Sequence, residues 1–182
     1  DSEEEVARVR PVLEGLKAAD CGAVLSVDTR KARVAEAALD AGAGLVNDVS
    51  GFTYDEALAP LCARREAPVC VMHGPIDPTI MQKDPPYDNV VLAVFDFLRG
   101  QIATLERAGI PKHLIIADPG IGFGKTLEHN LALLARLSLF HGLGVPILLG
   151  ASRKRFIGTI SEVETAKDRA PGSLGVTLAA LN

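Results

Sequence analysis

Several features that would assign the chain to a particular class of protein are scarce or missing. The 182 residues include no tryptophan, and aromatic residues make up only 4% of the chain. Leucine, valine, isoleucine and alanine must therefore form most of the core. No apolar run approaches the roughly 20 residues that a membrane-spanning helix needs, and no signal peptide is recognisable. We therefore expect a cytoplasmic protein with no membrane partner.

Cysteine and positive charge are also scarce. The three cysteines, Cys21, Cys62 and Cys70, are odd in number and lie in apolar surroundings, which favours reduced, packed thiols over a disulfide framework. The formal net charge is −4, which argues against non-specific attraction to nucleic acid. The hydrophobic content of 48% is enough for one substantial core, so we expect a single domain over residues 1–182.

Short apolar segments alternate with segments of helical periodicity along the chain. The predicted strands are 23–28, 44–49, 68–73, 114–118 and 146–150. The predicted helices are 2–16, 29–41, 53–66, 87–108, 126–143 and 173–182. The polar, proline-rich segment 74–88 is too long for an ordinary connection, so we interpret it as a functional loop. Because the strands are almost entirely apolar, the pattern predicts an α/β fold with a parallel sheet covered by helices.

Two architectures fit this alternation: an open doubly wound sheet and a segment of a (β/α)₈ TIM barrel. Polar residues end or directly follow every predicted strand, and they are Asp28, Asn47 with Asp48, His73, Asp118 and Ser152. Their occurrence on all five strands favours the barrel, in which they would converge on one mouth. The chain also begins and ends on a helical pattern. We therefore expect about five of the eight strands, with the first two and the last one missing.

The stretch DPGIGFGKT, residues 118–126, looks at first like a phosphate-binding loop. A P-loop would require a glycine at Pro119, and a dinucleotide-binding fingerprint would require one at Lys125. Asp118 is better suited to accept paired N–H donors from a heterocycle, with glycines that let a flat ligand come close and Phe123 as a stacking surface. The plainer interpretation, a tight strand-to-helix turn with Thr126 as the helix N-cap, is compatible with it.

Three strand ends carry groups that can pair with the edge of an aminopyrimidine ring: Asp28, Asn47 and Asp118. Each alone could equally well cap a helix or brace a loop. The basic run that starts at Arg153 is usually the mark of a solvated face, but Arg153 or Lys154 could instead bind a phosphate or carboxylate. His73 has no metal-ligand spacing around it, so we predict no metal site within the chain.

Six segments, in order, resemble the motifs of the dihydropteroate synthase family. They are LSVDTRK (25–31), LVNDVSG (45–51), VMHGPIDPTIMQ (71–82), DPGIGFGKTLEHN (118–130), LLGASRKRFIG (148–158) and APGSLG (170–175). The resemblance implies a (β/α)₈ barrel enzyme of folate biosynthesis, a transferase and sulfonamide target. Such an enzyme joins p-aminobenzoate to 6-hydroxymethyl-7,8-dihydropterin diphosphate and releases pyrophosphate. It also implies Mg²⁺ as the cofactor and a homodimer.

The same resemblance implies roles for individual residues. Polar pterin-binding groups would be Asp28, Asn47, Asp118 and Lys154, and the walls of the pocket would include Met72, Phe123 and Gly150. Ser152 and Lys154 would border the p-aminobenzoate site. Asp28, Asp118 and Lys154 would be the catalytic residues.

The chain also departs from the family pattern. The loop that begins at His73 reads differently, and the Asn ligand of Mg²⁺, the Thr-Arg-Pro-Gly loop and the Arg-x-His pair for the diphosphate have no counterpart. The Mg²⁺ ligand is therefore expected outside this chain. Two other functions stay open: a pterin-binding methyltransferase domain and a non-catalytic pterin-binding module. The SRKRFIG block argues against methyl transfer.

Overall fold

Four short parallel strands form the sheet of the computed structural model, which describes residues 1–20, 22–74 and 87–181. The strands are β1 (Ser26–Asp28), β2 (Leu45–Asp48), β3 (Val69–Met72) and β4 (Ile115–Asp118). They lie in the order β1-β2-β3-β4, so each strand pairs with the next one in the sequence. The order never reverses, and the sheet therefore has no switch point of the kind that defines a doubly wound sheet.

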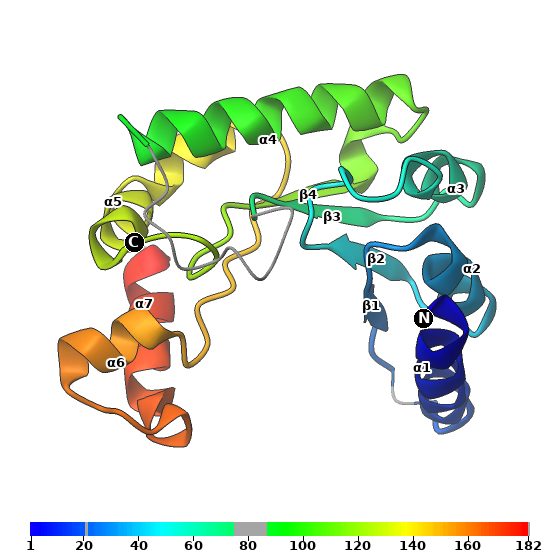
Figure 1. Ribbon diagram of the computed structural model, residues 1–182, viewed down its shortest axis with the longest axis horizontal. Helices are drawn as coiled ribbons and strands as arrows, with labels where there is room; N and C mark the ends of the chain where they lie inside the picture. The colour runs from blue at the N-terminus through cyan, green and yellow to red at the C-terminus, as the bar shows by residue number, and fades with distance from the viewer. Residues whose placement is uncertain (21, 75–86, 182) are drawn as a thin grey trace.

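The helices that follow the first three strands lie on one side of the sheet (Figure 1). The α-helices are α1 (Ser2–Ala18), α2 (Ala32–Asp40), α3 (Leu58–Arg64), α4 (Val90–Arg107), α5 (Leu127–Ala135), α6 (Arg155–Ser161) and α7 (Ala170–Ala180). Short 3₁₀ helices are η2 (Lys112–Leu114), η3 (Leu137–Leu143) and η4 (Ala166–Arg169). A sequentially ordered parallel sheet with its helices on the convex side is a segment of a (β/α)₈ barrel, which confirms the predicted fold class.

The two faces of the sheet carry different side chains because successive residues of a strand point to opposite sides. The face that packs against the helices is apolar and buried, with Val27, Val46, Val69, Val71, Ile115 and Ala117. The register aligns Asp28 with Asn47, Asn47 with Cys70, and Met72 with Asp118 on the opposite, inner face. Of the polar strand ends predicted to converge, Asp28, Asn47 and Asp118 thus share the inner face of the sheet, whereas Asp48 pairs with Val71 on the helix-facing side.

The predicted fifth strand, 146–150, is present only as a single bridge between Ala117 and Ile147. The Ala117 N–H donates to the Pro146 carbonyl, and the Leu148 N–H donates to the Ala117 carbonyl, both at 2.9 Å. Pro146 has no N–H of its own, so it can only accept at this edge. The segment lies where the prediction put it, beside β4, but the prediction of a regular strand is wrong.

Two predicted helices differ from the observed ones. The helix predicted over 53–66 begins only at Leu58, because the Asp55 carboxylate accepts the N–H groups of Ala57 and Ala32 and holds the preceding residues in a turn. The helix predicted over 126–143 ends at Ala135 and continues as the 3₁₀ helix η3. Helix α6 was not predicted. Of the functional loop predicted over 74–88, residues 75–86 lie outside the described residues, and so does Cys21.

Among the helices of the described ranges, none is both long and apolar enough to cross a lipid bilayer. Cys62 and Cys70 are free and fully buried, as predicted for packed thiols. Burial raises the pKa of Cys62 to about 11 and that of Cys70 to about 12. Both thiols therefore stay protonated at neutral pH.

The packing of α4 on the sheet yields a stability prediction. Leu98 is fully buried in the core, whereas Leu92 on the same helix is 55% exposed. Leu98→Ala should lower the free energy of unfolding by about 2–5 kcal/mol, because it leaves a cavity that the sheet cannot fill. Chemical denaturation followed by circular dichroism measures the change. Leu92→Ala is the matched control, and an equal loss in both variants would contradict this packing.

Candidate functional site

The site is organised around Asp118, the last residue of β4, whose side chain is only 7% exposed. Its Oδ1 accepts a 2.7 Å hydrogen bond from the Gly120 N–H, and its Oδ2 faces Gly150, 3.6 Å from where a Cβ there would lie. Burial raises the pKa of Asp118, while the Gly120 N–H and the charges of Lys154 and Lys125 oppose that rise. One carboxylate oxygen is thus hydrogen-bonded to the backbone, and the other faces Gly150.

Gly120 brings the loop after β4 into contact with the end of β3. Its φ is +70°, and a Cβ at this position would lie 1.9 Å from the His73 carbonyl oxygen. The His73 N–H also donates to the Asp118 carbonyl at 3.0 Å, so β3 and β4 stay paired one step beyond their regular ends. Only glycine fits here, because both the backbone conformation and the neighbouring carbonyl exclude a side chain.

Helix α5 braces the same loop from the other side. The Asn130 side chain accepts the Gly122 N–H at 2.7 Å and donates to the Thr126 carbonyl at 2.6 Å. Thr126 is the N-cap, and its hydroxyl accepts the His129 N–H at 3.2 Å. The predicted strand-to-helix turn with Thr126 as its cap is confirmed, and Asn130 is a buried loop-bracing residue to which the sequence reasoning gave no role.

Lys154 and Phe123 form a stacked pair above the loop. The Lys154 ammonium lies 3.8 Å from the centre of the Phe123 ring, a cation–π contact. Gly122 makes room for the lysine, since a Cβ there would lie 2.9 Å from Lys154 Cδ. Desolvation lowers the pKa of Lys154, and the Asp118 carboxylate raises it. The pair therefore places a cation and an aromatic face close to the buried carboxylate.

Asp28 and Asn47 form a second polar pair, at the far end of the inner face. The Asn47 amide donates to Asp28 Oδ2 at 3.2 Å. Desolvation raises the pKa of Asp28, the Asn47 bond lowers it, and the charge of Asp48 raises it further. Met72 on β3 is in register with Asp118 and only 2% exposed.

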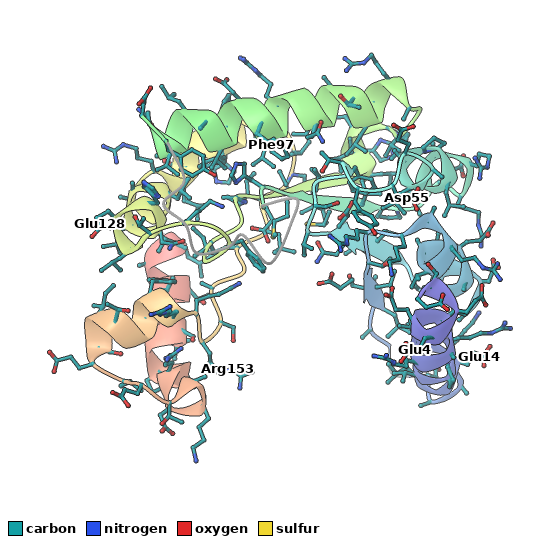
Figure 2. All side chains as sticks on the ribbon, in the orientation of Figure 1. Glu4, Glu14, Asp55, Phe97, Glu128 and Arg153 are labelled. Carbon is teal, nitrogen blue, oxygen red and sulfur yellow. The ribbon has the colours of Figure 1, made fainter. Side chains whose placement is uncertain are left out.

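Asp48 and His73, also singled out at strand ends, have other tasks. Asp48 is on the helix-facing side of β2, where its carboxylate accepts from Ser50 and Phe52 and shapes the following loop. The His73 ring packs edge-on against Phe97, a residue of α4 (Figure 2). Burial lowers the pKa of His73 to about 3, so this ring is neutral at physiological pH.

The residues of the basic segment that starts at Arg153 differ in burial. Lys154 is half-buried at the site, whereas Ser152 and Arg153 are exposed, and Arg153 points away from the strands (Figure 2). The backbone of Arg153 has a φ of +53° and is held from α7 and η4: its N–H donates to Ser173 Oγ at 2.7 Å, and its carbonyl accepts from Arg169 at 3.3 Å.

The roles of Arg169 and Ser173 were missed by sequence reasoning. Arg169 also donates to the Val163 carbonyl at 3.0 Å and to the Glu164 carbonyl, so one guanidinium ties together the chain on both sides of α6. Ser173 lies in the APGSLG segment (170–175), for which the sequence predicts no specific role. Together these two residues hold the loop that presents Lys154.

The donor set offers no metal site of its own in the described part of the chain. No group of three or more histidine, cysteine, aspartate or glutamate side chains is gathered there closely enough to hold an ion. The acidic groups at the site are separated across the inner face, with Asp28 on β1 and Asp118 on β4. This part of the site is suited to a neutral or cationic organic ring.

Comparisons with known proteins agree with this chemistry. The sequence profile of a family described as pterin binding enzyme matches residues 1–182. The dihydropteroate synthase of Escherichia coli is 42% identical over 178 residues, which is 98% of this chain and 62% of that protein. A probable bifunctional folylpolyglutamate synthase/dihydropteroate synthase of Haloferax volcanii is 44% identical over 98% of this chain and 21% of its own length.

Solved structures show the same likeness in three dimensions. Dihydropteroate synthase from Thermus thermophilus in complex with 6HMPPP superposes with a TM-score of 0.92 at 47% identity, covering 100% of this chain and 70% of that one. The Xanthomonas albilineans enzyme in complex with 7,8-dihydropteroate gives 0.91 at 42% identity, with 99% and 65% covered. This chain therefore spans about two thirds of the solved chains.

The contact at Gly120 yields a test of the site's architecture. Gly120→Ala should lower the free energy of unfolding by at least about 2 kcal/mol, because it combines an unfavourable φ with a backbone clash. The matched control is Gly100→Ala, at an exposed position in α4 with nothing within 4 Å of the added Cβ. That change should stabilise the helix by up to about 1 kcal/mol. Denaturant titration of both variants measures the free energy of unfolding. An unchanged free energy in Gly120→Ala would refute the contact with His73.

Proposed function

The chain belongs to the family of pterin-binding enzymes, whose profile matches it from end to end, and on this premise we propose that it forms the pterin site of a dihydropteroate synthase. The resemblance drawn from the six sequence segments is thereby confirmed at the level of the family. The proposed reaction condenses p-aminobenzoate with 6-hydroxymethyl-7,8-dihydropterin diphosphate to give 7,8-dihydropteroate and pyrophosphate. The chain covers 62% of the Escherichia coli relative, so the activity of the whole protein is itself part of the proposal.

The observation that carries the proposal is the buried carboxylate of Asp118. The pyrimidine edge of a pterin presents neighbouring N–H groups, and a carboxylate accepts two such groups side by side. The Gly120 N–H fixes the orientation of the carboxylate, and its Oδ2 faces Gly150, where the absence of a side chain leaves space. At the other end of the inner face, Asp28 and Asn47 supply further hydrogen-bonding groups for the same ring.

The proposed condensation would use the two carboxylates of the inner face. The carbon–oxygen bond between the pterin methylene and the diphosphate breaks, and its electron pair leaves with pyrophosphate. The amine nitrogen of p-aminobenzoate then attacks the methylene carbon. The attacking amine then loses a proton. As the leaving group departs, positive charge develops on the pterin, and the Asp28 and Asp118 carboxylates favour it electrostatically. Holding both substrates in one site adds the advantage of proximity.

Lys154 is proposed to contact both substrates, at the border between the pterin pocket and the p-aminobenzoate site. Its ammonium, stacked on the Phe123 ring, offers a cation for a carboxylate or a leaving phosphate. Ser152, two residues before Lys154, stays proposed for the p-aminobenzoate side although it makes no described contact to the pocket. Met72, Phe123 and Gly150 are proposed as walls of the pterin pocket.

Other expectations from the resemblance stay predictions. The residues described here do not fit a Mg²⁺ site, so no step is assigned to the ion, and its family ligand is expected outside this chain. The homodimer, the cytoplasmic location and the sensitivity to sulfonamides are likewise predictions. The two remaining functional candidates are a non-catalytic pterin-binding module and a methyltransferase domain.

The experiment that separates these functions is an assay of pyrophosphate release. Adding p-aminobenzoate and the pterin diphosphate to the protein should release pyrophosphate and form 7,8-dihydropteroate. Pterin binding without pyrophosphate would support the non-catalytic module, and it would overturn the synthase. Methyl transfer to an acceptor would support the methyltransferase domain instead.

Replacement of the central carboxylate tests the pterin contact directly. Asp118→Ala should abolish measurable pterin binding, because it leaves the paired N–H groups of the ring without an acceptor in a buried site. Calorimetric titration with the pterin substrate measures the affinity. Asp96→Ala removes an exposed carboxylate on α4 and should bind as the unsubstituted protein does. Normal affinity in Asp118→Ala would refute the assignment.

Replacement of Lys154 tests the second half of the site. Lys154→Ala should lower turnover by about 10²-fold or more while leaving the melting temperature nearly unchanged, because the lysine is only half-buried and its cation–π contact with Phe123 contributes only about 0.5–1 kcal/mol. Steady-state kinetics and thermal denaturation are measured on the same sample. Lys167→Ala, at an exposed position in η4, is the control. A large fall in melting temperature with little change in turnover would assign Lys154 a structural role.

A further inference from the structure

Lys125 makes an unusual set of contacts in the loop after β4. Its ammonium lies within hydrogen-bonding distance of three backbone carbonyl oxygens, those of Gly120 at 2.8 Å, Phe123 at 3.0 Å and His73 at 3.1 Å. A protonated lysine has three N–H donors, so each donor has one acceptor. The side chain therefore satisfies its full donor capacity within the protein.

These three carbonyls belong to the parts of the backbone that present the proposed pterin-binding groups. Gly120 donates its N–H to the Asp118 carboxylate, and Phe123 carries the ring beneath Lys154. His73 directly follows β3, the neighbouring strand. Lys125 thus joins two segments that are 52 residues apart for the His73 contact, at the point where both border the inner face.

We propose that Lys125 is a positioning residue that locks the β4–α5 loop onto the end of β3 and thereby aims the Asp118 carboxylate and the Phe123 ring at the bound pterin. The inference rests on the proposed function, because it concerns the same ligand. Lys125 acts through Asp118 and Phe123, and it needs no contact of its own with the substrate.

We call the three hydrogen bonds from Lys125 to the carbonyls of Gly120, Phe123 and His73 the clamp. The clamp depends on the protonation of Lys125. A neutral amine has two N–H donors and a lone pair, so one of the three carbonyls would face the lone pair instead of a donor. Only the ammonium form can hold Gly120, Phe123 and His73 together. Deprotonation would therefore loosen the loop at the very positions that orient the ligand-binding groups.

The surroundings of Lys125 bring its pKa close to neutral pH. Burial lowers the pKa of Lys125 from 10.5 to about 7, Asp118 on β4 opposes the shift, and Lys154 before α6 adds to it. The third facing group, the ring of His73 after β3, is neutral because burial lowers its pKa to about 3. The ammonium is accordingly lost as the pH rises through about 7.

Stability and ligand binding should respond to this titration in opposite directions. Between about pH 7 and pH 10.5 the unfolded chain binds the lysine proton and the folded chain does not, so this group makes the fold more stable as the pH rises. Pterin affinity, in contrast, should fall as the clamp loosens. A purely structural lysine would not produce this divergence.

The test compares the unsubstituted protein with Lys125→Met and Lys112→Met. Lys112 is an exposed lysine in η2, at the opposite end of β4, so the same substitution there is a matched control. Calorimetric titration with 7,8-dihydropteroate between pH 6 and pH 9, together with melting temperatures at each pH, gives both readouts. Lys125→Gln serves as a second variant in case the methionine does not fold.

The expected result has three parts. The unsubstituted protein and Lys112→Met should lose affinity by at least about 10-fold as the pH rises, following the loss of ammonium groups. Lys125→Met should bind about 10-fold more weakly at pH 6 and show little further pH dependence. Its melting temperature should be equal to or above that of the unsubstituted protein at pH 6, because a buried charge has been removed.

Every other outcome counts against the proposal. Unchanged affinity and pH dependence in Lys125→Met would overturn the positioning role while leaving the proposed function intact. A strongly lowered melting temperature, or failure of both Lys125 variants to fold, would make the lysine a requirement of the fold instead. Absence of 7,8-dihydropteroate binding by the unsubstituted protein at every pH would overturn the proposed function itself, and the inference with it.

Discussion

The hydrogen bond from the Gly120 N–H to the Asp118 carboxylate is the interaction on which the rest of the site depends. It commits one carboxylate oxygen to the loop and leaves the other directed toward Gly150. The bond can form only because Gly120 adopts a positive φ and passes against the His73 carbonyl. The orientation of a single buried charge thus follows from a backbone turn that couples β3 to β4.

Because side chains alternate along each strand, one face of the sheet forms the apolar core and the other face carries the polar residues of the site. Valine, isoleucine and alanine fill the face toward the helices, while Asp28, Asn47, Met72 and Asp118 occupy the other face at the ends of the strands. Within the described ranges, the desolvated carboxylates of Asp28 and Asp118 on the inner face are held by an amide and a backbone N–H, and no ion pair joins either of them. They therefore keep the capacity to balance a positive charge that develops on a ligand.

The sequence predicted the parts of this structure that local patterns encode. The apolar strands and their polar ends identified the fold class and the residues Asp28, Asn47 and Asp118, because the order of apolar and polar residues along the chain indicates which segments are buried strands and where they end. It could not reveal the single bridge at Ile147 or the start of α3, since these depend on Pro146 and on the remote hydrogen bond from Ala32 to Asp55. The tasks of Lys125 and Arg169 were also hidden. Both bind backbone carbonyls, which every residue possesses and no sequence pattern marks.

The loop that carries Lys154 is held by residues of η4 and α7 that lie outside the pocket. Ser173 and Arg169 hold the peptide next to Lys154, although they are separated from Arg153 by 20 and 16 residues. A substitution at either position would shift the lysine without changing any residue that lines the pocket. Variants with altered ligand affinity would then arise at positions remote in the sequence from Lys154, and a survey confined to the ligand-contacting residues would overlook them.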